Sequence, residues 1–230
     1  MPLHEWRIDP REHLRHETRR GRRHAYPGLV PRRTALAVID MVPFFVAGNP
    51  YCRSIVPNVN ALAGALRDAG GTVAWVLPAS EPSPDFFGPE VAELYRTSCG
   101  AGPLPGRLHP DLVPRPGDLY AAKTAPSAFF PGRCELPDLL AARGVDTVLI
   151  AGTVTNVCCE SSARDAATLG HRVVMVADAN AAGSDDQHNA TLHTFYRSFG
   201  DVRATADVLA MIAAGAGAGA GADRGRGAVG

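Results

Sequence analysis

Short apolar runs alternate along the chain with segments in which apolar residues recur at helical spacing. The apolar runs are mostly continuous, which indicates strands buried on both faces, as in a parallel sheet covered by helices. The expected strands cover residues 35–40, 72–78, 119–123, 146–152, 172–178 and a short segment near 201–204. The expected helices cover residues 57–69, 135–144, 158–170, 185–200 and 205–214. The pattern predicts an α/β fold: a three-layer αβα sandwich around a mostly parallel sheet of about six strands.

The two ends of the chain differ from this core. Residues 1–30 are expected to form an N-terminal extension with proline-bounded turns, and residues 31–212 the folded domain. Residues 213–230 are low-complexity Gly/Ala sequence with two arginines. Such a segment cannot bury enough apolar surface to order itself, so we expect a flexible, disordered tail.

Charge is balanced overall but uneven along the chain. Lys and Arg total 23, as do Asp and Glu, so no global field attracts nucleic acid or an anionic membrane. The extension is nevertheless basic, with Arg11, Arg15, Arg19, Arg20, Arg22 and Arg23. A basic arm can contact nucleic acid, but a solvated lead-in or an oligomer contact is the preferred interpretation. We expect a homodimer or homotetramer that binds a small molecule, and neither nucleic acid nor a membrane.

Cysteine usage and the apolar runs bear on the compartment. No stretch reaches the ~18 apolar residues of a membrane span, and the charged N-terminus lacks the apolar core of a signal peptide. The cysteines are five, an odd number, widely spaced and without a metal-binding pattern. A reduced cytoplasmic protein fits this better than a disulfide scaffold.

In parallel sheets the ligand site lies beyond the carboxyl ends of the strands. Three points of the sequence lie there: Asp40, Lys123 and the turn from Gly152 to Cys158. Asp40 ends an apolar run, where a carboxylate needs a partner or a catalytic task, such as general base; the alternative is a cap or turn residue. Lys123 is the only lysine in the chain, which suggests a specific role in stabilising a thiolate or oxyanion; the alternative is an ordinary surface lysine.

Cys158 opens an expected helix directly after a strand and turn. The positive end of a helix lowers the pKa of a thiol, and the amides of its first turn can hold an oxyanion. The alternative is a small buried hydrophobic residue. Cys159 is expected to point about 100° away from Cys158, toward the core, and a redox pair of the two is a further alternative.

The segments ALAVIDMVPFF, YAAKTAPSAFF and IAGTVTNVCCESSARDAATLGHRVVMVADA resemble, in order and spacing, the isochorismatase-like cysteine hydrolase superfamily. The resemblance extends over about residues 35–210. It implies a catalytic triad of Asp40, Lys123 and Cys158, and a cis peptide between Thr153 and Val154. It also implies an oxyanion hole formed by the backbone amides of Val154 and Cys158.

The resemblance implies that Asp40 takes the thiol proton and that Cys158 forms a thioester, without cofactor or metal. The metal-binding Asp-x-His pair of the nicotinamidase branch is absent after Asp40, and the intact Cys158 argues against vinyl-ether cleavage of the isochorismatase type. Family members often carry Gln and Asn where this chain has Val42 and Pro43, so a subfamily's substrate does not transfer.

The substrate pocket is less defined by the sequence. Phe45, Phe129 and Asn156 are expected to line it, and the long Pro/Gly-rich loop 79–118 to shape it or a subunit interface. His188 on the later helix is interpreted as structural.

The leading hypothesis is therefore a cysteine-dependent hydrolase of a C–N bond in a small amide, an N-carbamoyl or ureido compound, or a lactam. A streptothricin-type antibiotic lactam hydrolase is an alternative within this class. A non-catalytic isochorismatase-like binding module and a thiol redox sensor are alternatives outside it.

Overall fold

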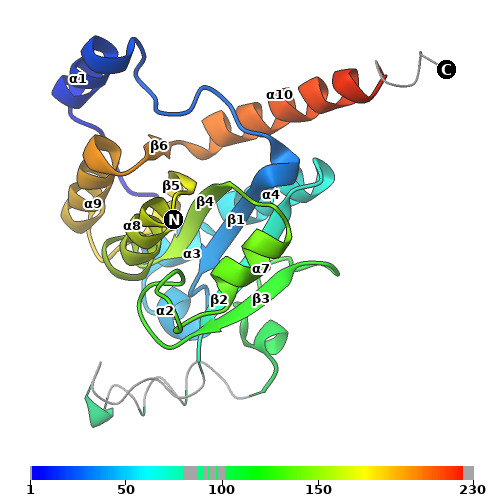
Figure 1. Ribbon diagram of the computed structural model, residues 1–230. Helices are drawn as coiled ribbons and strands as arrows, with labels where there is room; N and C mark the ends of the chain where they lie inside the picture. The colour runs from blue at the N-terminus through cyan, green and yellow to red at the C-terminus, as the bar shows by residue number, and fades with distance from the viewer. Residues whose placement is uncertain (1, 80–87, 91–92, 94–96, 98–101, 225–230) are drawn as a thin grey trace.

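A six-stranded, fully parallel sheet forms the centre of the protein (Figure 1). The structure is a computed structural model that describes residues 2–79, 88–90, 93, 97 and 102–224. The strand order is β3-β2-β1-β4-β5-β6. The strands are β1 (Thr34–Ile39), β2 (Thr72–Pro78), β3 (Leu119–Lys123), β4 (Thr147–Thr153), β5 (Arg172–Ala181) and β6 (Asp201–Arg203). The predicted αβα fold is confirmed, with β5 longer than expected.

Helices connect the strands and cover the sheet. The α-helices are α1 (Pro10–Arg20), α2 (Pro43–Ala47), α3 (Pro50–Ser54), α4 (Val56–Asp68), α7 (Leu136–Ala142), α8 (Glu160–Thr168), α9 (Asp185–Ser198) and α10 (Thr205–Arg224). Two short 3-10 helices, η1 (Pro31–Arg33) and η2 (Leu104–Arg107), and a π-helical turn, η3 (Thr155–Cys159), complete the described elements.

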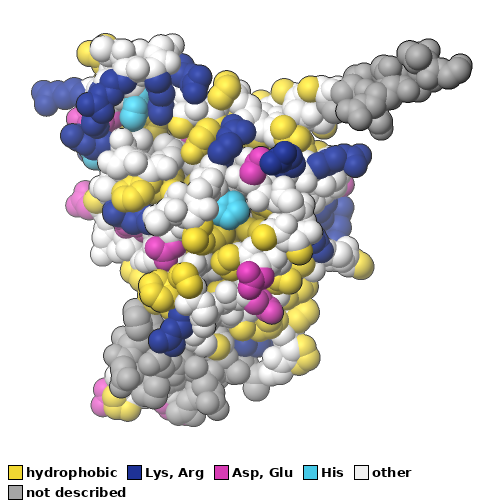
Figure 2. Space-filling model, in the orientation of Figure 1, with side chains coloured by type: hydrophobic (Ala, Val, Ile, Leu, Met, Phe, Trp, Pro, Cys, Tyr) yellow, Lys and Arg dark blue, Asp and Glu magenta, His cyan; other side chains and the backbone are white. Residues whose placement is uncertain are grey.

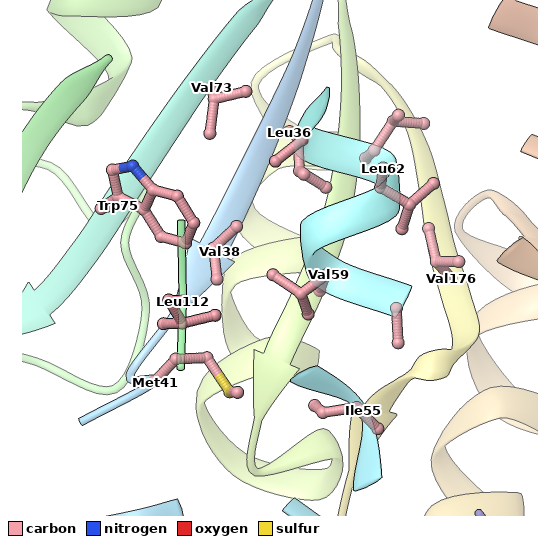
Figure 3. Packing of buried hydrophobic residues seen from close by; sticks show 14 of the residues in the cluster. Leu36, Val38, Met41, Ile55, Val59, Leu62, Val73, Trp75, Leu112 and Val176 are labelled. Atoms are coloured by element: carbon pink, nitrogen blue, oxygen red, sulfur yellow. The ribbon is translucent and has the colours of Figure 1, made fainter. Parts of the chain in front are cut away.

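Each face of the sheet has its own apolar core. On one face, Leu36 and Val38 of β1 and Trp75 of β2 pack against Val59 and Leu62 of α4, as Figure 3 shows. The alternate residues of the same strands point to the other face, where α7, α8 and α9 cover them. Because both faces are covered, both sets of side chains are apolar, which explains the continuous apolar runs.

The switch point of the sheet lies between β1 and β4. From β1 the chain adds β2 and β3 on one side, and from β4 it adds β5 and β6 on the other. At the carboxyl end of this pair Gly152 has a φ of +121°, and a Cβ there would lie 2.1 Å from the Ile39 carbonyl oxygen. Only glycine lets β4 approach β1 so closely. Ligand sites of open parallel sheets lie at such switch points.

The N-terminal arm, residues 2–30, packs onto the domain and contains a helix where proline-bounded turns were expected. Asp9 caps α1 by accepting a hydrogen bond from the Arg11 amide (2.9 Å), and Pro10 provides a favourable first helical residue. Glu12 forms an ion pair with Arg197 of α9 at 2.8 Å. The arm is therefore attached to its own chain, although Figure 2 shows that its basic side chains remain gathered on the surface over α1.

The C-terminal helix also differs from the expectation. α10 continues to Arg224, so residues 213–224 are helical and were not expected to be ordered. Alanine is the strongest helix former. A Cβ on Gly215 would lie 2.4 Å from the Leu29 carbonyl oxygen and 2.8 Å from Pro31 Cδ, which shows how closely α10 packs on the segment before β1. Residues 225–230 lie outside the described residues.

Within the described part of the chain, no helix combines the length and apolar character that crossing a bilayer requires.

Candidate active site

Asp40 directly follows β1 in an unusual backbone conformation. Its φ of +53° is uncommon for a residue other than glycine, and such outliers often occur at functional sites. Its amide donates to the Val76 carbonyl (2.9 Å) and so extends the sheet ladder by one residue. Its carbonyl accepts from Thr153 Oγ1 of β4 (3.0 Å). These bonds fix the turn that directs the 1% exposed Asp40 side chain to the end of the sheet.

Lys123, the last residue of β3, contacts both Asp40 and Cys158. Its Nζ lies 2.9 Å from Asp40 Oδ2 and 3.6 Å from Cys158 Sγ, and it donates to the Ala125 carbonyl (3.1 Å). Lys123 is 5% exposed, so its charge is almost fully removed from water. The structure therefore brings together Asp40, Lys123 and Cys158, which lie far apart in the sequence.

Cys158 lies in the π-helical turn η3, not at the start of a helix as expected. The turn begins at Thr155, and α8 follows from Glu160. The Cys159 amide donates to the Val154 carbonyl (3.2 Å), which is the wide i→i+5 bond of a π-turn. π-turns inside helices occur frequently at functional sites. The half-buried Cys158 side chain is thereby placed beside Lys123.

Val154 precedes this turn. Its peptide bond with Thr153 is cis, as predicted, and its own backbone is extended, with φ −93° and ψ 146°. The assignment of the Val154 and Cys158 amides to an oxyanion hole stays a prediction.

The three side chains change one another's acidity. Burial raises the pKa of the Asp40 carboxyl, with the Lys123 charge acting in the opposite direction. Burial, together with the Asp40 charge, also raises the pKa of the Cys158 thiol far above its usual range. Burial lowers the pKa of Lys123, but Asp40 and Cys158 outweigh this effect and raise it. These directions favour the charged form of Lys123 and the protonated thiol form of Cys158.

This charge state differs from the expectation of a preformed thiolate at a helix end. The sequence suggested a lowered thiol pKa, but removal from water and the neighbouring carboxylate dominate. A carboxylate with a raised pKa is a stronger base, so the arrangement suits proton transfer from Cys158 to Asp40 at the moment of reaction.

Cys159 points into the core and is completely buried. It belongs to the buried cluster that includes Ala163 and Ala166 of α8, and the half-buried Cys158 packs against the edge of that cluster. The burial of Cys159 in the core agrees with the expectation. Cys52, Cys134, Cys158 and Cys159 are free thiols, and Cys99 lies outside the described residues.

The expected pocket residues fall into two groups. Phe45 is partly buried and contacts Phe44 edge to face, with ring centroids 4.8 Å apart, and Asn156 is partly exposed in η3. Phe129, in contrast, is completely buried in the core, with its ring edge-on to His171. Phe129 belongs to the same buried cluster as Leu136 and Leu140 of α7. Its role as a pocket residue stays a prediction. Much of loop 79–118 lies outside the described residues.

Two polar residues beside the turn were not assigned to the site by the sequence. The Thr155 hydroxyl lies 2.8 Å from His188 Nδ1, and both side chains are completely buried. His188 lies on the inner face of α9 with Thr191, Leu192 and Phe195, at helical spacing. This periodicity was visible in the sequence and could have indicated that His188 faces inward, toward η3.

Among the residues described, no group of three or more His, Cys, Asp or Glu side chains is arranged to hold a metal ion.

Comparison with known proteins agrees with this geometry. A family model described as the isochorismatase domain matches residues 34–207. The chain is 29% identical over 204 residues to the ureidoacrylate amidohydrolase RutB of Enterobacter sp. (strain 638), covering 77% of this chain and 88% of that protein. Among solved structures, a cysteine hydrolase from Pseudomonas syringae pv. phaseolicola 1448A superimposes with a TM-score of 0.72 at 27% identity, covering 84% of this chain and 97% of that one.

N-carbamoylsarcosine amidase from Thermoplasma acidophilum superimposes with a TM-score of 0.61 at 26% identity, covering 75% of this chain and 96% of that one. The strand order and the side chains gathered at the strand ends thus define an isochorismatase-like α/β domain. The family match makes the assignment plain: the chain belongs to the isochorismatase family.

Proposed function

We propose that the protein is a cysteine-dependent amidohydrolase that cleaves a carbon–nitrogen bond of a small molecule through a thioester-type intermediate. The observation that carries the proposal is the position of Lys123 Nζ, 2.9 Å from Asp40 Oδ2 and 3.6 Å from Cys158 Sγ. A base, a cation and a nucleophile therefore meet at the switch point of the sheet, where ligands of such folds bind.

In the first half of the reaction Asp40 accepts the proton of the Cys158 thiol, and the sulfur forms a bond to the carbonyl carbon of the substrate. The amides of Val154 and Cys158 are expected to hold the oxyanion that develops. The Lys123 ammonium stabilises the thiolate and keeps Asp40 ionised before the transfer. When the C–N bond breaks, the leaving ammonia or amine takes the proton from Asp40.

In the second half a water molecule attacks the carbonyl carbon that is bound to sulfur. Asp40, again a carboxylate, accepts a proton from this water. The C–S bond breaks, the sulfur recovers its proton from Asp40, and the acid product leaves. Protons and bonds balance over the two halves, and the enzyme returns to its resting state without a metal or redox step.

The relatives favour one substrate class. Ureidoacrylate amidohydrolase and N-carbamoylsarcosine amidase are both named for substrates that carry a ureido or carbamoyl group. We therefore propose an N-carbamoyl or ureido compound as the substrate, ahead of a simple amide or a lactam.

The test is a turnover assay over a panel of N-carbamoyl amino acids, ureido acids, primary amides and lactams. Ammonia release measures turnover of the first three classes, and mass spectrometry measures ring opening of the lactams, which release no ammonia. Cys158→Ala should abolish turnover, reducing it by at least about 10⁴-fold, because the nucleophile is lost. Cys159→Ala is the matched control, since the adjacent buried thiol has no role in hydrolysis. Equal turnover by Cys158→Ala and wild type would disprove the nucleophile assignment.

The same panel separates the alternatives. Turnover of lactams alone would favour the streptothricin-type hydrolase, and loss of function in Cys159→Ala would favour the thiol redox sensor. Binding of panel compounds without turnover would favour the non-catalytic module.

A further inference from the structure

His4 of the N-terminal arm lies in a slot beside the turn that carries Cys158. Its ring stacks on Tyr51 of α3, with centroids 3.9 Å apart, and on His188 of α9, with centroids 4.3 Å apart. The interplanar angles are 15° and 16°, so the three rings form one continuous stack. The His4 side chain is only 2% exposed, although it belongs to the fourth residue of the chain.

Both nitrogens of the His4 ring are used in hydrogen bonds. Nε2 accepts from the Ala182 amide (3.0 Å), so the ring proton lies on Nδ1 and is donated to Asp185 Oδ1 (2.6 Å). Two hydrogen bonds fix the ring within its plane, and two stacked neighbours fix it across that plane. The orientation of His4 is therefore determined on every side.

One path from His4 to the catalytic turn runs through His188. Burial is the largest cause that lowers the pKa of His188, to about 3, so its ring is neutral at physiological pH. Its Nδ1 bonds the Thr155 hydroxyl, and Thr155 begins the π-turn that contains Cys158. The ring stack thus limits the movement of His188, and His188 in turn holds Thr155 at the start of this turn.

A second path runs through the end of β5. The Ala182 amide donates a hydrogen bond to His4. Ala182 directly follows Ala181, the residue of β5 that pairs with Thr153 of β4. Thr153 in turn donates to the Asp40 carbonyl (3.0 Å). His4 therefore supports both sides of the site, the Asp40 backbone and the Cys158 turn.

The arm itself is held in register beside His4. Asn189 of α9 donates to the Glu5 carbonyl (2.9 Å) and accepts from the Arg7 amide (2.7 Å). Ile8 is buried in the core on the same side. These contacts hold the arm, and with it His4, in position, and they involve none of the candidate catalytic residues.

We propose that His4 is a positioning residue: the N-terminal arm inserts it to hold His188 and the end of β5, and through them the turn of Cys158, in the geometry required for attack. This inference rests on the proposed hydrolase function. His4 acts through Thr155 and Thr153 and contacts none of the reacting groups. Small displacements of reacting atoms are known to reduce rates strongly, so such support has a measurable effect.

The test compares His4→Ala with His13→Ala in the full chain. His13 lies on the same arm and bonds the Tyr196 hydroxyl (3.0 Å), so it contributes to attachment of the arm but not to the turn. His4→Ala should lower kcat by about tenfold or more with KM changed by less than about twofold. It should also speed hydrogen–deuterium exchange of residues 153–159, whereas His13→Ala should change neither.

Two further variants keep the test decisive if His4→Ala folds poorly. Thr155→Val removes the bond to His188 and leaves the arm intact, so it should reproduce the loss of kcat. His4→Phe keeps the ring stack and should recover part of the exchange protection. The inference is overturned if exchange and kcat of His4→Ala match wild type, if His13→Ala has the same effects as His4→Ala, or if Thr155→Val is fully active. Exchange needs no substrate, so a failure of the proposed function, shown by inactive wild type, is distinguished from a failure of the His4 inference.

Discussion

The Lys123 ammonium lies 2.9 Å from a carboxylate oxygen of Asp40, and the two side chains are 4% and 1% exposed. The two residues come from β3 and β1, which are not neighbours, because β2 lies between them. A buried pair of this kind is strongly destabilised when one partner is removed, since the remaining charge has no compensation.

Replacing Lys123 with Met should therefore lower both stability and activity. We expect a loss of about 3–5 kcal/mol in the free energy of unfolding, measured by urea denaturation, because Asp40 is left buried without its cation. Arg115→Met is the control: Arg115 pairs with Asp68 at 3.5 Å on the surface. Its loss should cost at most about 1 kcal/mol. Equal effects of the two substitutions would contradict the burial argument.

The charge of Asp40 should slow the reaction of Cys158 with iodoacetamide. Burial, together with the Asp40 charge, raises the pKa of the thiol, so iodoacetamide should label wild-type Cys158 slowly at pH 7 and faster as the pH rises above the usual thiol pKa. Asp40→Asn removes that charge while Lys123 remains, so labelling at pH 7 should become several-fold faster although turnover is lost.

Mass spectrometry of the Cys158 peptide gives the labelling rate, with Cys158→Ala as the blank. Slower labelling of Asp40→Asn than of wild type would show that the carboxylate promotes the thiolate in the free enzyme, contrary to this prediction.

Gly152→Ala should be severely destabilising. The new Cβ would lie 2.1 Å from the Ile39 carbonyl oxygen, and φ is +121°, so β1 and β4 would have to separate. We expect a loss of more than about 3 kcal/mol, measured by thermal or urea unfolding. Gly64 of α4 is the matched control, because a Cβ there meets no atom within 4 Å. Gly64→Ala should leave stability unchanged or raise it by about 0.5–1 kcal/mol.

Asp118 should contribute to the acid sensitivity of the fold. Burial raises the pKa of this carboxyl, but hydrogen bonds from Arg67, the Arg115 amide and Trp75 outweigh burial and lower it. Its stabilisation is therefore complete above the unfolded-state pKa of about 3.9 and is lost as the pH falls through the lower folded-state pKa.

The free energy of unfolding of Asp118→Asn should accordingly fall less steeply than that of wild type between about pH 5 and pH 2. Asp68→Asn, at a 75% exposed carboxylate, serves as the control. Parallel pH curves for wild type and Asp118→Asn would contradict the assignment.

The strands β1, β2 and β4 were predictable because each is covered on both faces. A continuous apolar run needs only composition to be recognised, and the observed strand limits lie within a residue of the expected ones for β1 to β4. β5 continues to Ala181 because a register irregularity between Ile150 and Gly152 lets its end pair again with β4. Such irregularities depend on the neighbouring strand, which the local sequence does not contain.

The candidate site was partly predictable for a similar reason. Strand ends and the single lysine indicated Asp40 and Lys123, since charges at the ends of buried strands need partners. The acidity of Cys158 was not predictable, because it depends on burial and on Asp40, which lies far away in sequence. The start of the turn was also misplaced, because the i→i+5 bond of a π-turn leaves no periodic pattern.

The N-terminal arm shows the limit of local reasoning most clearly. Asp9 and Pro10 are ordinary start signals of a helix and could have indicated α1. The place of His4, in contrast, depends on Tyr51 and His188, which only the folded chain brings to it. Tertiary contacts of this kind have no signature within their own segment.

Lys123 is carried by β3, which is an edge strand of the sheet, whereas Asp40 and Cys158 follow central strands. Edge elements open locally with a smaller free energy than the centre of a fold. Detachment of β3 alone would withdraw the ammonium and leave the rest of the sheet paired. In a denaturant titration, loss of enzymatic activity should therefore precede loss of the circular-dichroism signal. The position of Lys123 on an edge strand thus makes the activity more sensitive to mild denaturing conditions than the fold as a whole.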